Sequence, residues 1–326
     1  MENDKRKVLT VTMNPCFDRT IHVDKVEHGG THRPESVQND VGGKGINVST
    51  VLTHFGEPTV CLGFCYSADG NIVEKALDDR GIPHDFVIVD GRTRTNIKIH
   101  EKESGVMTEF NEKGSHVGSE KQQQLIECID SYLDQAGVIV LDGSVPEGVP
   151  TDSYEQMIRM ANGRGVKTIL DASGELLAKG VRAVPYLIKP NISEFCETFG
   201  IKTEDESKIL EKAREIAESG ITYICISMGN AGAYLVSRET ILYAEPMQVE
   251  VRGVQGAGDS MVAGFCLALN RELSMREMFA CGVAAASGSL RHPGTKLCTK
   301  EELEELLPQV VIREVAWCPV LRERQL

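Results

Sequence analysis

The sequence lacks a basic excess. Its 326 residues contain 35 Lys and Arg against 48 Asp and Glu, which gives a formal net charge of −13. General nucleic-acid binding requires a basic surface, so this composition argues against that class of function. It does not argue against small anionic substrates, because a few local cations are enough to bind a phosphate.

Long apolar runs and paired cysteine motifs are also missing. The run Val8–Met13 is too short for a secretory segment, and no run approaches the ~20 apolar residues of a membrane span, so we expect a cytoplasmic protein. None of the ten cysteines forms a Cys-x-x-Cys motif. Most of them, such as Cys225 and Cys266, lie in apolar stretches, which favours buried thiols over disulfides or a zinc site.

The chain does contain a regular alternation of short apolar runs with stretches of helical spacing. Repeated strand-then-helix units predict a mostly parallel sheet that is covered on both faces. We therefore expect a single α/β domain over residues 1–326 with a doubly wound sheet. A strand over residues 233–236 is expected to be followed directly by a glycine-rich turn.

Two segments interrupt this alternation, at about 19–40 and 92–111. Each has the pattern of a hairpin. In the second, Arg94 and Lys98 alternate with Ile97, so that the cations lie on one face of the strand. The two hairpins are expected to pair into one small sheet that covers a site or forms a dimer contact.

A small-residue turn, Gly256-Ala257-Gly258, directly precedes Asp259 and a run of apolar residues at helical spacing from Met261 onward. The unpaired N–H groups of such a helix start attract an anion, most often a phosphate. Asp259 is placed to take a proton from the group that attacks this phosphate. The alternative is that Asp259 is an ordinary N-terminal cap.

A second glycine turn precedes the helix that begins near residue 48, and it contains Gly43, Lys44 and Asn47. Its spacing is not that of a Walker A loop. Asp18 is expected at the carboxyl end of the first strand, where open α/β sheets bind ligands. The alternatives are a solvated lysine and an aspartate that caps a turn.

Three motifs together resemble the PfkB (ribokinase-like) carbohydrate kinases, in the family's order and over residues 8 to about 307. Asn14-Pro15 with Asp18 and Lys44 resembles the branch of the 1-phosphofructokinases and tagatose-6-phosphate kinases, and residues 92–98 lean toward the former. The three motifs are Gly42-Gly43-Lys44-Gly45-Ile46-Asn47, Lys189-Pro190-Asn191 with Glu194, and Gly256-Ala257-Gly258-Asp259-Ser260.

The resemblance implies a ribokinase-like core with a β-sheet lid that often joins dimers, and transfer of a phosphoryl group from ATP with Mg²⁺. It implies that Asp259 is the catalytic base and that the turn from Gly256 through Ala257 and Gly258 stabilises the transferred charge. By the same resemblance the sugar phosphate is bound by Asp18, Gly43, Lys44, Asn47, Arg94, Lys98 and Ser144, and ATP by Lys189, Asn191, Glu194, Ser227, Gly229, Gly232 and Gly258, with Glu194 meeting the metal through water.

The expected substrate is a phosphorylated ketohexose, with fructose 1-phosphate first and tagatose 6-phosphate as the alternative. A kinase for another sugar or a nucleoside is disfavoured because it would not need the cations of the 94–98 strand. A sugar-phosphate-binding regulator without catalysis is a more distant alternative, since Asp259 and its turn are present. The residues Val254-Gln255 depart from the family's pattern before the turn.

Overall fold

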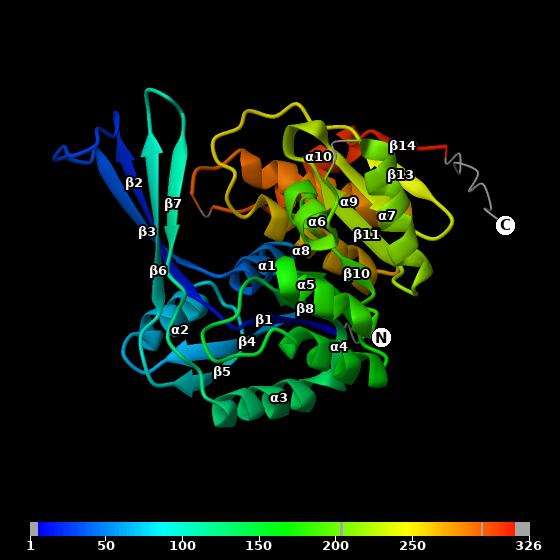
Figure 1. The fold of residues 1–326 in the computed structure, drawn as a ribbon, viewed down its shortest axis with the longest axis horizontal. Coiled ribbons are helices and arrows are strands. Elements are labelled where there is room, and N and C mark those ends of the chain that lie inside the picture. The colour runs from blue at the N-terminus through cyan, green and yellow to red at the C-terminus, as the bar shows by residue number, and fades with distance from the viewer. Residues whose placement is uncertain (1–5, 203–204, 295, 317–326) are drawn as a thin grey trace.

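The computed structural model describes residues 6–202, 205–294 and 296–316. A ten-stranded sheet with helices on both faces makes up most of it, and a separate four-stranded sheet stands beside this core (Figure 1). The mixed α/β architecture predicted from the sequence is confirmed.

In spatial order the large sheet contains β5 (His84–Val89), β4 (Thr59–Tyr66), β1 (Lys7–Thr12), β8 (Ala136–Asp142), β9 (Lys167–Asp171), β10 (Leu187–Ile188), β11 (Tyr223–Ser227), β12 (Ala233–Val236), β13 (Ile241–Ala244) and β14 (Ile312–Glu314). Seven neighbouring strands are parallel, from β5 at one edge to β11. The last three strands at the other edge, β12, β13 and β14, are short and pair in the antiparallel direction.

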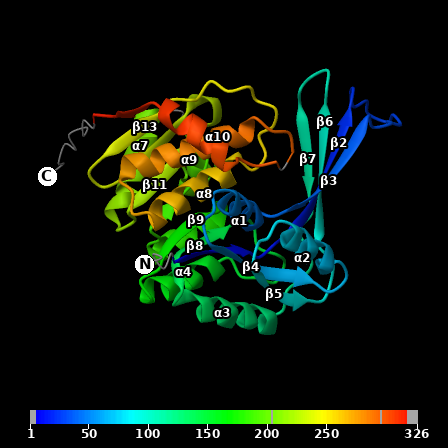
Figure 2. The same cartoon turned by 180° about the vertical axis from the view of Figure 1, so that it is seen from behind.

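Alternating side chains of the buried strands supply two apolar cores, one for each face of the sheet. Leu9 and Val11 of β1 belong to one core, while Val8 of the same strand belongs to the other. Figures 1 and 2 show the helices on the two faces of the sheet. The first core is covered by α3 (Ser119–Leu133), α4 (Ser153–Gly163), α5 (Gly174–Gly180), α6 (Ile192–Phe199) and α7 (Glu206–Glu218). The opposite face is covered by α1 (Lys44–His54), α2 (Gly70–Asp79), α8 (Ala257–Asn270), α9 (Met275–Leu290) and α10 (Lys300–Leu306).

The helices α8 and α9 pack backbone against backbone. A Cβ at Gly264 would lie 2.5 Å from the carbonyl oxygen of Cys281, so only glycine permits this approach. Both helices are buried over most of their length. The helix that carries Asp259 is therefore held rigidly in the core, which fixes its N-terminus at the edge of the sheet.

The smaller sheet, which we call the lid sheet, contains both predicted hairpins and confirms that they pair. Its polar face is the buried one, since Asn96 and Lys98 are each 8% exposed, whereas Ile97 and Phe110 on the other face are 36% and 58% exposed. Its order is β3 (Ser36–Gly42), β2 (Cys16–Val23), β6 (Arg94–Glu101) and β7 (Met107–Asn111), with β2 and β6 parallel.

Two elements were missed in the sequence. Strand β13 lies between β12 and the glycine turn, because the chain folds back at Ser237–Thr240 and pairs with β12 before it reaches that turn. Helix α5 follows β9 directly and is only seven residues long.

The cysteines Cys225 and Cys266 are fully buried among apolar side chains, as expected. Within the described ranges, no helix is both long and apolar enough to cross a bilayer.

Candidate active site

The chain changes direction across the sheet beside β1. From β1 it proceeds to β4 and β5 on one side, and it later returns to lay down β8, β9, β10 and β11 on the other. Ligands of open α/β sheets bind at such a switch point, beyond the carboxyl ends of the strands. Thr12 and Asp142, which pair in register, end the two strands that meet here.

A cavity of about 480 Å³ opens at this point, between the strand ends of the core and the polar face of the lid sheet. All seven predicted sugar-side residues line it, together with Gly256 and Asp259 of the predicted catalytic turn. The lining consists of Thr12, Asn14, Cys16, Asp18, Gly43, Lys44, Asn47, Arg94, Asn96, Lys98, Glu109, Asn111, Asp142, Gly143, Ser144, Val254, Gln255, Gly256 and Asp259.

Asp259 lies in the first turn of α8 with its carboxylate against the cavity. Gly256, the N-cap, has φ 71°, and a Cβ there would lie 2.3 Å from Leu297, so the turn requires glycine. The side chain of Asn47 donates a hydrogen bond to Asp259 Oδ2 at 2.7 Å. Burial raises the pKa of Asp259, against the opposing effect of Lys44, so this carboxyl holds a proton more tightly than a free aspartate.

Two lysines converge on one buried carboxylate beside this helix start. Lys44 Nζ lies 3.1 Å from Asp171 Oδ1, and Lys189 Nζ lies 3.2 Å from Asp171 Oδ2. Burial raises the pKa of Asp171, but Lys189 and Lys44 outweigh it, so the pKa lies below its usual range. A Cβ at Gly258 would lie 3.3 Å from Lys189 Nζ, which places this ammonium beside the anion-binding turn.

The lid sheet contributes polar side chains to the cavity, among them the carboxylate of Asp18, the amide of Asn96 and the cations of Arg94 and Lys98. Lys98 Nζ lies 3.2 Å from Asp18 Oδ2, and Asn96 donates to Asp18 Oδ1 at 3.1 Å. The expected place of Asp18 at the end of the first strand is wrong, because β1 ends at Thr12 and Asp18 reaches the cavity from β2. Arg94 donates to two backbone carbonyls, those of Asn14 and Glu112.

The predicted ATP-side residues form a neighbouring group around the ends of β10 and β11, outside the cavity lining. Asn191 and Ser227 are joined by a β-bridge. Asn191 and Glu194 cap α6 reciprocally, at 2.8 Å in each direction. Gly229 and Gly232 follow in a tight turn with φ 58° and 87°. Lys189 of this group lies beside the catalytic turn, at Gly258.

Several residues that line the cavity, and Asp171, which pairs with Lys44 of the lining, were not predicted as site residues. Asp142 and Asp171 both end buried strands, and this position was the signal that would have found them. Asn96 lies on the same face of its strand as Arg94 and Lys98. Gln255, in the segment that departs from the family pattern, approaches Met107 of the lid sheet, with Nε2 3.9 Å from the sulfur.

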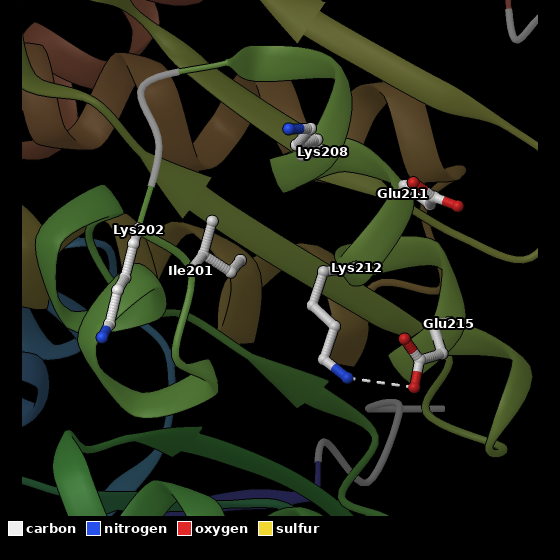
Figure 3. A pocket seen from close by; sticks show the side chains of 6 residues that line it. All are labelled: Ile201, Lys202, Lys208, Glu211, Lys212 and Glu215. Atoms are coloured by element: carbon white, nitrogen blue, oxygen red, sulfur yellow. Dashed lines mark hydrogen bonds and ion pairs between the residues drawn. The ribbon is translucent and has the colours of Figure 1, made fainter. Parts of the chain in front are cut away.

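A second cavity, of about 380 Å³, lies over α7. Figure 3 shows that its lysines, Lys202, Lys208 and Lys212, do not converge on one point, and Lys212 pairs with Glu215 at 3.0 Å. No strand end or glycine turn lines it among the described residues. It therefore has none of the features that make the first cavity a candidate site.

The fold and the first cavity define a class of enzyme. A doubly wound sheet whose switch point holds a helix N-terminus, a buried carboxylate and paired lysines is suited to phosphoryl transfer, which depends on positioning and charge neutralisation more than on covalent help.

Comparison with known proteins agrees with this class. Residues 11–302 match the description "pfkB family carbohydrate kinase". The 1-phosphofructokinase of Xanthomonas campestris pv. campestris is 34% identical over 314 residues, which cover 95% of this chain and 99% of the relative. That of Bacillus subtilis is 32% identical over 305 residues, with coverages of 94% and 99%.

Among solved structures, phosphofructokinase-2 from Escherichia coli in complex with substrates and products superposes with a TM-score of 0.87 at 28% identity, covering 93% of this chain and 99% of that one. The chain belongs to the pfkB family of carbohydrate kinases. It is therefore an ATP-using phosphotransferase with an alcohol group as acceptor, and the resemblance drawn from the three motifs is confirmed.

Proposed function

We propose that this protein transfers the γ-phosphoryl group of ATP to fructose 1-phosphate and forms fructose 1,6-bisphosphate. One observation carries the proposal: the cavity beside Asp259 is lined by three cations, Lys44, Arg94 and Lys98. Lys44 and Lys98 already pair with Asp171 and Asp18, but the hydrogen bonds of Arg94 go to neutral backbone carbonyls. A sugar phosphate provides Arg94 with a charged partner, which a neutral sugar does not. The names of the 1-phosphofructokinases similar to this chain support the same substrate.

The neutral part of the cavity suits a ligand with several hydroxyl groups. The side-chain oxygens of Asn14, Asn47 and Asn96 are buried and accept no hydrogen bond from the described part of the chain. A buried acceptor without a donor is costly, so each favours a ligand that donates. Sugar hydroxyls are such donors, and these residues surround the same space as Asp18 and Ser144.

In the proposed reaction Asp259 accepts the proton of the attacking hydroxyl. The N–H groups of Ala257, Gly258 and Asp259 face the transferred phosphoryl group, and Lys189 neutralises charge beside them. Glu194 is a single carboxylate at the ATP side. That donor set fits Mg²⁺ held mainly by nucleotide phosphates and water, with Glu194 as its protein contact through water.

The direct test is an ADP-release assay with ATP and Mg²⁺ that compares kcat/KM for fructose 1-phosphate, tagatose 6-phosphate, fructose 6-phosphate and fructose. We expect the highest value with fructose 1-phosphate. A preference for tagatose 6-phosphate would keep the site and mechanism but change the substrate. Ligand binding without ADP formation would contradict the kinase assignment.

Replacing Arg94 by alanine is expected to raise the KM for the sugar phosphate roughly 10- to 100-fold, the scale of a lost charge-assisted hydrogen bond, and to change the KM for ATP far less. Steady-state kinetics with each substrate varied in turn measure both. Arg92→Ala is the matched control, because Arg92 is exposed and pairs with Glu112 outside the cavity lining. Equal effects of Arg94→Ala on the KM values for both substrates would show that Arg94 does not bind the sugar phosphate specifically.

The outer face of the lid sheet supports a homodimer. Val37, Ile97 and Phe110 are exposed there, and an apolar face of this kind is typical of an interaction surface. Ile97→Lys with Phe110→Lys is expected to convert a dimer to a monomer, measured by light scattering after size exclusion. Ile72→Lys, on the exposed side of α2, is the control. A wild-type protein that is monomeric at micromolar concentration would contradict the proposal.

A further inference from the structure

Three acidic side chains and two lysines form one group at the carboxyl ends of β8, β9 and β10 and at the starts of α1 and α8. Asp142, Asp259 and Lys44 line the cavity, and Asp171 and Lys189 join the group through the ion pairs of Asp171. Asp142 and Asp171 pair in register on adjacent parallel strands. Side chains in such a pair stand on the same face, with their backbones only ~4.8 Å apart. The two carboxyl groups therefore lie side by side under the catalytic turn.

Asp171 has two ion-pair partners, whereas Asp142 has none among the described residues. Asp171 receives both ammonium groups, from Lys44 at 3.1 Å and from Lys189 at 3.2 Å. Asp142 is 3% exposed, and neither of its carboxyl oxygens has a hydrogen-bond partner in the described part of the chain. One of them, Oδ1, lies against the first turn of α1, 3.1 Å from where a Cβ of Gly45 would be.

An ionised carboxylate that is buried without partners is far more costly than the neutral acid. The sum of the charges of the three acids and two lysines also favours neutral Asp142. With Asp142 neutral, Asp171 and Asp259 balance Lys44 and Lys189, whereas ionised Asp142 would leave one negative charge in excess. That excess would lie where two anionic substrates have to bind.

We propose that Asp142 is a positioning residue whose neutral carboxyl, beside the Lys44–Asp171–Lys189 group, leaves Lys44 available for the phosphate of the bound sugar. The inference rests on the proposed function. Ionised Asp142 would compete for Lys44, whose stem lies over Gly143 with Cδ 3.8 Å from that residue's Cβ position. The side chain of Lys44 is 36% exposed and lines the cavity while it pairs with Asp171, so it lies between this group and the cavity.

The direction of the pKa shift of Asp142 agrees with a neutral carboxyl. Burial, followed by the charges of Asp259 and Asp171, raises the pKa of Asp142 well above its usual range, against the opposing effects of Lys44 and Lys189. The charged and titratable groups that face Asp142 from the elements around it are Lys44 of α1, Cys61 of β4, Tyr154 of α4, Asp171 of β9, Lys189 after β10, and Asp259 and Cys266 of α8.

The protonation state can be measured on the full chain without substrates. The infrared difference spectrum between wild type and Asp142→Asn at pH 7 is expected to contain the C=O band of a protonated carboxyl that belongs to wild type. The same band is expected to remain in Asp79→Asn, a control at an exposed carboxylate far from this group, and to be absent from Asp142→Asn, which assigns it to Asp142. Absence of the band in wild type, or its persistence in Asp142→Asn, would overturn the proposal.

The kinetic arm uses the same variants. As the pH rises far enough to remove the band, the KM of wild type for fructose 1-phosphate is expected to rise about tenfold or more, the scale of one charge-assisted contact, with a smaller change for ATP. The KM of Asp142→Asn is expected not to follow this rise. Identical pH profiles in the two proteins would refute the positioning role. Absence of turnover by wild type would instead contradict the proposed function and leave the infrared result standing.

Discussion

Asp259→Asn is expected to lower kcat at least ~10²-fold, the scale of a lost general base. Asparagine keeps the shape of the side chain and can still accept the hydrogen bond from Asn47, but it cannot take a proton from the attacking hydroxyl. The KM values and the thermal unfolding of the variant separate chemistry from folding. A kcat within about tenfold of wild type would rule out Asp259 as the base.

The pH dependence provides a second readout of the same residue. Because the pKa of Asp259 is raised, the base becomes protonated at a higher pH than a free aspartate would. We therefore expect wild-type kcat to fall on the acid side, beginning above pH ~4. The folded state binds this proton more tightly than the unfolded state, so ionisation of Asp259 costs stability as the pH rises. Asp259→Asn removes that cost and is expected to be at least as stable as wild type at pH 7.

Asp171→Asn is expected to have the largest effect on stability, a loss of about 3–5 kcal/mol in the free energy of unfolding. The carboxylate is 1% exposed and Lys189 is 4% exposed, so its removal leaves a buried ammonium group without its ion pair. Urea unfolding at pH 7 measures the loss. Asp79→Asn is the control, since its pair with Lys75 is exposed and such pairs contribute roughly 0–1 kcal/mol.

The depressed pKa of Asp171 also predicts how the contribution of its ion pairs to stability changes with pH. The pKa of Asp171 is depressed in the folded state, so its stabilising contribution is present above the unfolded pKa of ~3.9. That contribution disappears as the pH falls through the lower, folded pKa. The difference in unfolding free energy between wild type and Asp171→Asn should therefore shrink with acidification below pH ~4. A difference that is constant with pH would show that the ion pair is not its source.

The features that could be predicted from the sequence are those whose determinants are local. The turn before Asp259 depends on three consecutive small residues, and the parallel sheet depends on apolar runs that are each complete within a few positions. The lid hairpins were found for the same reason. Their alternation also placed Lys98 and Arg94 on one face, and both line the cavity.

The interactions between distant segments could not be predicted. Asn47 and Asp259 are 212 residues apart, and only the fold shows that the amide orients the carboxylate. Lys44 is at the start of α1 and Asp171 is at the end of β9, and only the fold shows that the two side chains pair. Strand β13 was missed because it is four residues long and its pairing with β12 depends on the turn between them.

The parallel pairing of β2 with β6 has a consequence for the order of folding. These strands belong to different hairpins, and the hydrogen bond between Asn96 and Asp18 joins residues 78 positions apart. Closing such a loop is entropically costly, and assembly of β1, β4 and β5 lowers this cost because it brings the ends of the two hairpins close. We infer that pairing of the lid sheet depends on prior assembly of these three core strands. The wall of the substrate pocket then depends on the core strands for its stability, so a mild denaturant that loosens those strands is expected to reduce substrate binding as well.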